Sequence, residues 1–598
     1  MLKSRALATA FLLTSTAICF AQQSTSRRLT PESYGVVTGA GQSATVRAAN
    51  FRAMNTCFQD SITARVPMML PAATIEIDIP NNRSLEESSI KITSDLQLQG
   101  TDKSLSRIKC GPESPTYQYS AFSVWPGTNV TIKDCTIEGP ADPGPNGNDN
   151  FITCAIRQIG MVQRNRRVVY DVPGEIKLEN VTIAGEFFNG IIGDHGDCLL
   201  DLINCDVTGY VQCVGWFAKF NTGKRLHAYN SYFHDAGLPA TSSSTAKGHL
   251  VYLSPCVSFD INNCRFGRSS RYGIHHYGSS DLPPKYAKLT NCTFEQSCVD
   301  GIETTNTGVT QIAGCTFNNK GRGVILKGDC DITDSTFNCA SGISTYDNHS
   351  RVQISITGCN INVTDVGVLT SSWPKSTWHI NACTFTGRTS YAIAVGDGAV
   401  ESQTYIDDCA FNGSFGRGIH AVAGSFYINR CDFSGSYSAA AIQQDETGSL
   451  ISIEVNDSKF KNNGQTIWGY VGVPDKIRGS NNYFATNQPV AGRGVYHRLE
   501  LRATASPNSI ISTATLMPNF NYSSYHVTGA ARIDNIKVGG DDSVNQMCGG
   551  RLVLIAEGAW SLSNTGNIRP IATTPRRVGK KVVLIHDPAA GYWLEVER

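Results

Sequence analysis

The sequence is poor in charge and lacks the long apolar runs that a membrane protein needs. Only 17% of its 598 residues are charged, against about a quarter in typical soluble proteins, and the formal net charge is +1. No cluster of Lys and Arg exceeds a few residues, which argues against nucleic acid as a partner. No segment reaches the roughly 20 consecutive apolar residues of a transmembrane helix, so stable membrane insertion is not expected. Pairs of Cys-x-x-Cys are also missing, which argues against a zinc site.

The N-terminus has the pattern of a secretory signal peptide. Lys3 and Arg5 precede an apolar run from about Ala6 to Phe20, and small residues suited to cleavage follow as far as Ala21. We therefore assign residues 1–21 to a signal peptide and expect a secreted or periplasmic protein.

A short phrase returns through the middle of the chain. It consists of an apolar residue, two turn-forming or polar residues, Cys or Ser, and an apolar residue two positions later. Its clearest copies are INNCRF (261–266), LTNCTF (289–294), IAGCTF (312–317), INACTF (380–385), IDDCAF (406–411) and INRCDF (428–433). Successive copies are 20 to 28 residues apart, and a Gly followed by an apolar residue comes after most of them, as in Gly273-Ile274 and Gly301-Ile302.

This spacing predicts a coil of short strands joined by turns, because the apolar residues alternate with a period of two. Each coil must stack on its neighbours at about 4.8 Å to bury its inner face, which makes a solenoid of parallel sheets. Cys and Phe are two residues apart, so both point inward. The repeated cysteines then form an internal column whose parallel side chains favour free thiols over disulfides, whereas the remaining cysteines could pair.

With these repeats, the chain resembles the pectate-lyase-like superfamily of right-handed parallel β-helix proteins. The leading segment, ESYGVVTGAGQSATVRAANF (32–51) followed by LPAATIEID (70–78), is similar to the segment that begins many of these proteins, with Ala73 where Gly is usual. The resemblance extends over about residues 31–490. It implies an all-β fold whose open end is capped by a helix, here at about residues 44–64.

Three regions follow the signal peptide: an N-terminal capping segment (22–90), the β-helix (91–490) and a small β-rich module (491–598). The repeat is absent from the last region, and its sequence predicts antiparallel strands with Gly-rich turns. This tail resembles the C-terminal modules of phage tailspike-like depolymerases, many of which are trimers, so a homotrimer is one expectation.

Acid–base and charged side chains gather on a few neighbouring coils. When the repeats are aligned on the apolar residue that follows Gly, the next position should point outward, and there the chain has Tyr252, His275, Glu303 and Ile325 in successive coils. The position two residues further on should also point outward, and it holds Tyr277 after His275 and Lys327 after Ile325. Lys247, His249 and Arg271 lie close by in the sequence, whereas the next coils have Ser344, Leu369 and Ala394 at the corresponding position. A patch confined to a few coils is typical of a functional site.

These residue types suit β-elimination at a uronic acid, so an acidic polysaccharide is the expected substrate. The reaction needs a cation for the carboxylate, a base for the C5 proton and an acid for the leaving oxygen. We predict Lys247, Arg271, His275, Tyr252, His249 and Glu303 as catalytic residues, and Tyr277, Lys327, Asp194 and Asp300 as substrate-binding residues. Lys247 and Arg271 are one coil apart, which is similar to the Lys and Arg of alginate-lyase and chondroitinase-B-like lyases, although the surrounding motif is not matched.

Two alternatives stay open. Glycoside hydrolysis needs two carboxyl groups about 5 to 9.5 Å apart; Asp194 and Glu303 are four coils apart, and Asp300 and Glu303 should face opposite sides of one strand. A non-catalytic glycan-binding or adhesin protein would use exposed aromatic rings instead, for which the candidates are Trp125, Trp216, Trp373 and Trp378. No cofactor is certain, and Ca²⁺ could bind at Asp142, Asn146, Asn148 and Asp149, or at Asp194 and Asp197.

Overall fold

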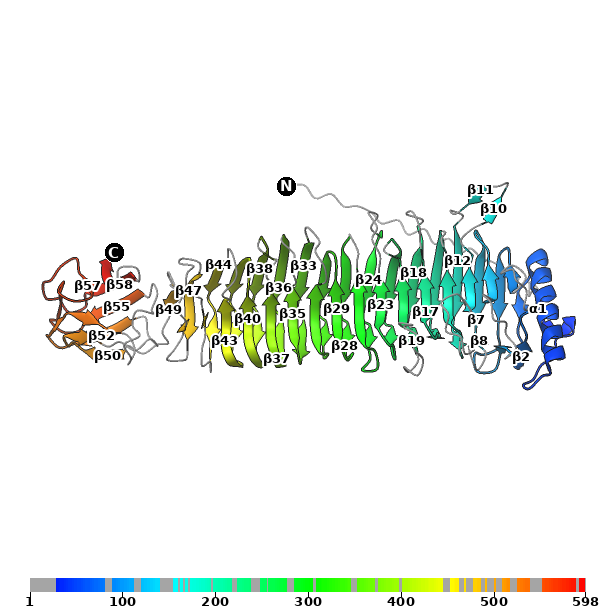
Figure 1. Ribbon diagram of the computed structural model, residues 1–598, viewed down its shortest axis with the longest axis horizontal. Helices are drawn as coiled ribbons and strands as arrows, with labels where there is room; N and C mark the ends of the chain where they lie inside the picture. The colour runs from blue at the N-terminus through cyan, green and yellow to red at the C-terminus, as the bar shows by residue number, and fades with distance from the viewer. Residues whose placement is uncertain are drawn as a thin grey trace, which may run out of the picture.

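The protein, as a computed structural model, is a long parallel β-helix with a helix at one end and a small β-module at the other (Figure 1). The solenoid has three faces along its length, and each face is a parallel sheet, here called sheet A, B or C. The residues that the structure describes are 28–80, 89–111, 120–139, 154–159, 162–164, 167–169, 173–185, 187–194, 197–217, 223–237, 248–254, 256–276, 284–304, 308–345, 352–370, 375–396, 399, 401–444, 452–461, 467–468, 477–484, 490–491, 499–501, 508–516, 524–537, 551–587 and 591–596.

Sheet A is built from the strand that opens each coil. Its strands are β1 (Met68–Met69), β4 (Leu96–Gln99), β7 (Asn129–Lys133), β12 (Gly174–Glu179), β15 (Cys198–Ile203), β18 (Arg225–Tyr229), β21 (Ser258–Asn262), β24 (Ala287–Thr290), β27 (Thr310–Ala313), β30 (Cys330–Thr333), β33 (Val352–Thr357), β36 (Ser376–Asn381), β38 (Gln403–Asp407), β41 (Ser425–Asn429), β44 (Ser452–Asn456), β47 (Ile477–Phe484) and β49 (Leu499–Leu501).

Sheet B is built from the second strand of each coil and carries the column of Phe side chains. Its strands are β2 (Thr74–Ile77), β5 (Arg107–Cys110), β8 (Thr136–Glu138), β13 (Thr182–Ala184), β16 (Asp206–Thr208), β19 (Tyr232–His234), β22 (Arg265–Phe266), β25 (Thr293–Phe294), β28 (Thr316–Phe317), β31 (Thr336–Phe337), β34 (Asn360–Val363), β37 (Thr384–Val395), β39 (Ala410–Phe411), β42 (Asp432–Phe433) and β45 (Lys459–Phe460), and it ends in part of β47.

Sheet C is built from the third strand and carries the predicted site. Its strands are β3 (Ile90–Ile92), β6 (Ser120–Val124), β9 (Cys154–Gln158), β14 (Asn189–Gly193), β17 (Gln212–Trp216), β20 (His249–Leu253), β23 (Tyr272–His276), β26 (Asp300–Thr304), β29 (Arg322–Leu326), β32 (Ser341–Thr345), β35 (Val366–Thr370), β40 (Ser414–Ala421), β43 (Ser436–Gln444), β46 (Ile467–Trp468) and β48 (Val490–Ala491), with part of β37 between β35 and β40.

Pairing between successive coils is parallel in all three sheets, so each residue has a partner at the same height in the next coil. The inward residues make one continuous core from the N-terminal helix to Phe460. Stacked rings run along sheet B, where Phe266, Phe294, Phe317 and Phe337 have centroids 4.5 to 4.8 Å apart and nearly parallel planes. The predicted solenoid and its inward Phe column are therefore present.

The turn between sheets A and B explains the repeated Cys or Ser. The thiol of Cys292 donates to the main-chain oxygen of Thr290 at 3.3 Å and accepts from the main-chain N–H of Cys264 at 3.5 Å. Ser335 makes the same two contacts, with Thr333 and Cys315. A hydroxyl can thus replace the thiol, and the described cysteines, in the column and outside it, are free thiols. Cys548 lies outside the described residues.

The residue before each Cys or Ser adopts a left-handed conformation. Asn263 and Asn291 have φ of 53°, and Asp334 has φ of 48°. Asn and Asp tolerate this region better than other residues with a side chain, because their short polar group bonds locally. Backbone geometry therefore favours Asn, Asp and Gly at this position of the repeat, although Ala382 and Arg430 also occupy it.

The helix α1 (Ala44–Ala64) lies across the N-terminal end of the solenoid, preceded by the 3₁₀ helix η1 (Pro31–Tyr34) (Figure 1). Its buried side chains, among them Phe51, Met54 and Phe58, join the continuous core. The helix bounds match those predicted. Ser43 caps the helix, accepting a hydrogen bond from the main-chain N–H of Val46 at 3.4 Å. The segment 1–21, predicted as a signal peptide, lies outside the described residues.

A second, separate core forms the C-terminal module. Its strands are β50 (Asn508–Ile511), β51 (Thr515–Leu516), β52 (Ser524–Thr528), β53 (Arg532–Ile533), β54 (Asn535–Ile536), β55 (Arg551–Ala556), β56 (Ser561–Leu562), β57 (Ile568–Arg569), β58 (Lys581–Asp587) and β59 (Tyr592–Val596). The prediction of antiparallel strands is wrong for most of the described pairings in this module. The pairs β50–β52, β52–β55, β51–β54, β53–β56 and β57–β59 are parallel, whereas β55–β58 and β58–β59 are antiparallel.

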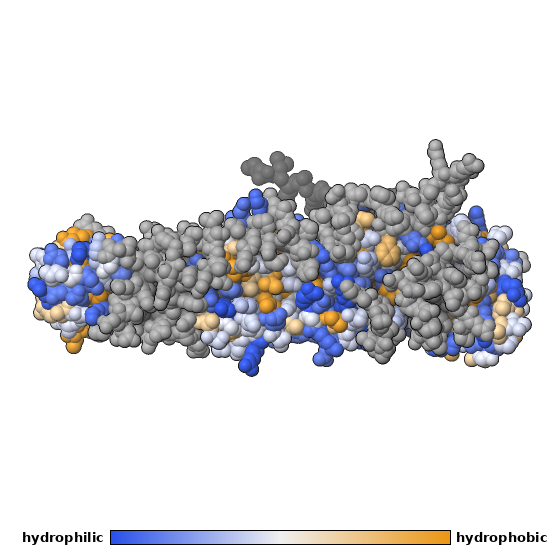
Figure 2. Space-filling model, in the orientation of Figure 1, coloured by the Kyte–Doolittle hydropathy of each residue, from blue (hydrophilic) through white to orange (hydrophobic). Residues whose placement is uncertain are grey.

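A short antiparallel hairpin, β10 (Val162–Arg164) with β11 (Arg167–Val169), projects from the N-terminal half of the solenoid (Figure 1). Hydrophilic and hydrophobic side chains are interleaved along the side of the solenoid that Figure 2 shows. No helix among the described residues is long and apolar enough to cross a membrane.

Candidate functional site

The predicted outward column is present on sheet C. Tyr252 of β20 pairs with His275 of β23, and His275 pairs with Glu303 of β26. The following coils place Ile325, Ser344, Leu369 and Ala394 in the same column. Tyr252, His275 and Glu303 therefore lie on three consecutive coils, and the next titratable side chain toward the C-terminal end of this column is His420.

A second column runs beside it on the same face. It contains His249, Tyr272 and Asp300, and Arg322 follows in the next coil. The rings of Tyr272 and His275 lie 4.8 Å apart, so the two columns are neighbours. The expectation that Asp300 and Glu303 face opposite sides of their strand is wrong.

Two successive inward positions explain this arrangement. A Cβ at Gly301 would lie 2.2 Å from the main-chain oxygen of Gly323 and 2.8 Å from the ring of Phe317, so this position faces the core. Ile302, the next residue, is also fully buried in the core. Two successive inward residues shift the alternation, which places residues 300 and 303 on the same outward side.

Four aromatic and imidazole rings pack together between these columns. Nδ1 of His275 lies 3.4 Å from Nε2 of His249. The ring of His249 stacks on Tyr272 with centroids 5.5 Å apart, and Tyr252 meets His275 edge to face at 5.0 Å. His249, Tyr272 and His275 are buried, whereas Tyr252 is half-buried. Tyr252 is therefore the ring of this cluster that solvent reaches.

Burial sets the protonation of the cluster. It lowers the pKa of His275 to about 3, with help from the positive charges of Arg271 and Lys327, so this imidazole is neutral at physiological pH. Burial and the neighbouring Glu303 carboxylate raise the pKa of Tyr272 to about 12. A neutral imidazole can accept a proton, and a neutral phenol can donate one.

Two cations border the cluster. The guanidinium carbon of Arg271 lies 4.7 Å from the ring centroid of Tyr272. Nζ of Lys327 lies 2.9 Å from Oε1 of Glu303, and both side chains are almost fully buried. His275 Nε2 is 3.5 Å from the other oxygen of Glu303. Arg271, which is half-buried, is thus the cation at the outer side of the cluster.

Other predicted residues take different positions. Asp194 lies four coils from Glu303. Its carboxylate accepts hydrogen bonds from the guanidinium of Arg157 at 2.8 and 3.0 Å. Asp300 accepts from the side chain of Arg322 at 2.9 Å and from its main-chain N–H at 2.7 Å. Lys247 and Tyr277 lie outside the described residues. His276 points inward, with its ring 5.3 Å from that of Phe259.

Two of the four candidate tryptophans cannot stack on a sugar from solvent. Trp216 and Trp378 are fully buried, because both point into the solenoid core. Trp125 is half-buried, and Trp373 lies outside the described residues. The candidate calcium loop at 142–149 also lies outside them. Within the described part of the chain, no three His, Cys, Asp or Glu side chains gather in a way that could hold a metal ion.

Sequence reasoning missed two features of the surface. Tyr272 was not predicted, although its place directly after Arg271 and three residues before His275 was a signal. On sheet B, His234 bridges Asp206 and Asp235 at 2.7 Å each, and Arg268 contacts Asp235 at 2.6 Å. The hydrogen bonds of the two carboxylates raise the pKa of His234 against the opposing effect of burial. Asp206 and His234 come from adjacent coils, which only the register reveals.

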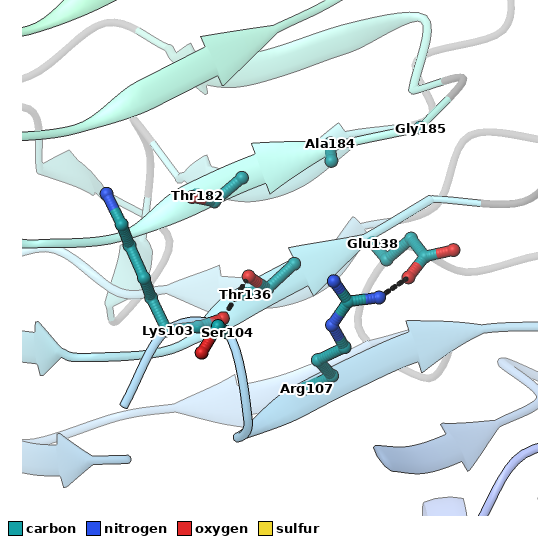
Figure 3. A pocket seen from close by; sticks show the side chains of 8 residues that line it. All are labelled: Lys103, Ser104, Arg107, Thr136, Glu138, Thr182, Ala184 and Gly185. Carbon is teal, nitrogen blue, oxygen red and sulfur yellow. Dashed lines mark hydrogen bonds and ion pairs between the residues drawn. The ribbon is translucent and has the colours of Figure 1, made fainter. Parts of the chain in front are cut away.

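An open pocket of about 390 Å³ lies further toward the N-terminal end of sheet B, over β5, β8 and β13 (Figure 3). Figure 3 shows Lys103 and Arg107 on either side of Thr136, with Arg107 directed toward Glu138. Nη1 of Arg107 lies 3.6 Å from Oε2 of Glu138. The pocket is on a different sheet from the cluster around His275, so the two are separate.

Comparison with known proteins supports the fold. The family model described as a right handed beta helix region matches residues 249–433. No curated protein matches the chain. Among solved structures, the mannuronan C-5 epimerase A-module of Azotobacter vinelandii covers 77% of this chain and all of its own, at 10% identity and a TM-score of 0.34.

Two further structures show the same kind of likeness. A surface adhesin of Streptococcus pneumoniae covers 96% of this chain and all of its own, at 10% identity and a TM-score of 0.29. A tailspike protein of a Pseudomonas phage covers 88% of this chain and 86% of its own, at 12% identity and a TM-score of 0.33. These likenesses concern fold alone. With the parallel register of its three sheets and the matching family model, the chain is identified as a right-handed parallel β-helix protein.

Proposed function

We propose that the protein is a secreted enzyme that cleaves an acidic polysaccharide by β-elimination at the cluster around His275. One observation carries the proposal: a neutral imidazole, a half-exposed phenol and a guanidinium lie together on consecutive coils of one face. These are the three chemical groups that the reaction requires.

Each group has a distinct role. Arg271 would bind the uronate carboxylate and neutralise its charge, which makes the C5 proton more acidic. The imidazole of His275, or of His249 beside it, would accept that proton, and the phenol of Tyr252 would donate one to the leaving glycosidic oxygen. Glu303 and Lys327 act as positioning residues, because their ion pair lies behind the imidazole. Lys247 remains a predicted catalytic residue, and Tyr277 a predicted substrate-binding residue.

Glycoside hydrolysis is the second candidate, because Asp300 and Glu303 share a face of sheet C. Each of these carboxylates already faces a cation, Arg322 or Lys327, at 2.9 Å. Hydrolysis requires one carboxyl group to carry a proton. Elimination uses the groups in the arrangement that they have, so it is the function we favour.

The test is incubation of the purified protein with alginate, pectin, glycosaminoglycans, neutral glycans and bacterial capsules. Elimination produces unsaturated sugars that absorb ultraviolet light as well as new reducing ends, and we expect both signals. Tyr252→Phe and Arg271→Gln should lower the rate at least about 100-fold, as removal of a general acid or a charge-stabilising group does. Arg388→Gln, at an exposed arginine on β37, is the matched control and should leave the rate unchanged.

The outcomes separate the candidate functions. Reducing ends without ultraviolet absorbance, abolished in Asp300→Asn, would replace elimination with hydrolysis. Retention of a polymer without any release of oligosaccharides would favour a glycan-binding protein. The predicted homotrimer is tested separately by the mass of the protein in solution, and calcium dependence by activity after chelation.

A further inference from the structure

The outer face of sheet C carries a second group of side chains much like the first. Tyr272 and Tyr391 occupy the same column, five coils apart. His275 and His420 occupy the neighbouring column, six coils apart, so His275 shares a coil with Tyr272, whereas His420 lies one coil beyond Tyr391. At both places an arginine lies over the tyrosine ring: Arg271 at 4.7 Å from Tyr272, and Arg417 at 5.3 Å from Tyr391.

The second group is fixed by its own contacts. Nη1 of Arg417 donates to the hydroxyl of Tyr391 at 3.1 Å, and Nε donates to the side-chain oxygen of Gln443. The ring of His420 stacks on Tyr391 with centroids 5.0 Å apart. Gln443 is buried, whereas Tyr391, Arg417 and His420 are half-buried. The guanidinium is therefore held in one orientation while solvent still reaches the group.

The charge of Arg417 is not balanced within the described part of the chain. Four other buried or partly buried arginines there are paired with a carboxylate at 2.6 to 2.9 Å: Arg47 with Asp78, Arg157 with Asp194, Arg322 with Asp300 and Arg576 with Glu595. Arg417 and Arg271 contact no carboxylate of the described residues. A guanidinium has five donors, and Arg417 uses two of them on groups of the described residues. The remaining donors suit a carboxylate from outside the protein.

Between Glu303 and His420, the column that contains His275 carries no charged side chain. Ile325, Ser344, Leu369 and Ala394 lie there in register. Five steps at about 4.8 Å separate the two tyrosines by about 24 Å along the solenoid. An extended sugar chain that follows the axis would meet a fixed arginine at each end of this stretch.

We propose that Arg417, with Tyr391, His420 and Gln443, forms a second binding subsite for the carboxylate of an acidic polysaccharide. The chain would lie along sheet C and reach Arg271 and Arg417 at once. The ligand class rests on the proposed function, but binding at Arg417 does not depend on cleavage at the first group. Affinity should therefore rise with chain length once an oligosaccharide is long enough to reach both arginines.

The experiment is equilibrium binding of short and long oligogalacturonates and oligomannuronates, with a neutral glucan series for comparison. Arg417→Gln should weaken binding of the long acidic oligosaccharide at least about tenfold and leave that of the short one nearly unchanged. Arg417→Lys keeps the charge but loses the planar fork, so it should show a smaller loss. Arg388→Gln is the matched control and should bind like the wild type.

Two results would overturn the proposal: wild-type affinity of Arg417→Gln for long oligosaccharides, or an equal loss for the short and long ones. Tyr391→Phe, which removes one hydrogen bond to Arg417, provides a milder variant if Arg417→Gln does not fold, and a partial loss restricted to long chains is expected. Binding that depends on Arg417 without any cleavage would support this subsite while contradicting the proposed elimination. Cleavage together with binding that Arg417→Gln leaves unchanged would support the proposed elimination and contradict this subsite.

Discussion

Lys327 and Glu303 form an ion pair of 2.9 Å whose side chains are only 8% and 5% exposed. Both charges have lost most of their contact with water, so each depends on the other. The pair also joins two adjacent coils of sheet C and stands beside His275. It therefore links the stability of the solenoid to the geometry of the candidate site.

Removing one member of this pair should be costly. We expect Lys327→Met to lower the free energy of unfolding by about 3 to 5 kcal/mol, because it leaves a buried carboxylate without its partner. Lys375→Met breaks a pair with Glu401 at 3.1 Å in which both side chains are more than half exposed, and should cost less than about 1 kcal/mol. Denaturant unfolding measures both, and equal losses would contradict the prediction.

His275 should make stability depend on pH in the acidic range. Its pKa is about 3 in the folded protein and 6.5 in the reference state. The unfolded chain therefore binds more protons between these values, and the contribution of His275 to stability falls as pH drops from 6.5 toward 3. His275→Gln should flatten the pH dependence of the unfolding free energy in that window. If the unfolding free energy of His275→Gln has the same slope against pH as that of the wild type, the prediction is contradicted.

Lys224 should make the stability of the protein depend on pH in the alkaline range. It is buried, with Nζ donating to Gln158 at 2.7 Å and lying 4.2 Å from the centre of the Trp216 ring. Burial lowers its pKa from 10.5 to about 7, so the unfolded chain holds the proton more tightly. Stability should rise as pH increases from about 7 to 10.5, and this rise should be smaller in Lys224→Met. Lys288→Met, at an exposed lysine on β24, should keep the wild-type slope.

Ala382 should be a site where the protein can be stabilised. Its φ is 52°, in the same turn where other repeats have Asn263 and Asn291. A left-handed alanine is strained and asparagine adopts this region more readily, so Ala382→Asn should add about 1 kcal/mol to the free energy of unfolding. Ala313→Asn, within the extended strand β27, should not stabilise the protein. A thermal shift of equal size in both variants would contradict the reasoning.

The candidate site was only partly predictable from the sequence. Tyr252, His275 and Glu303 could be placed in one column by aligning consecutive repeats, in which His275 and Glu303 each follow a Gly-apolar pair. Tyr272 and Asp300 could not be placed beside them, because strict alternation assigns residues 300 and 303 to opposite sides. Gly301 and Ile302 both face the core, where the next coil approaches Gly301 closely, and this pair of inward residues changes that assignment.

The sequence by itself determined the repeat, the inward column of Phe and Cys, the left-handed turn residues and the capping helix. These depend on local side-chain direction and backbone preference, which a single repeat already contains. Tertiary structure decided which carboxylate meets which cation, how deeply His275, Glu303 and Lys224 are buried, and that Tyr391 stands in the column of Tyr272. Those properties depend on register between coils of unequal length, because a contact between coils exists only after the coils have stacked.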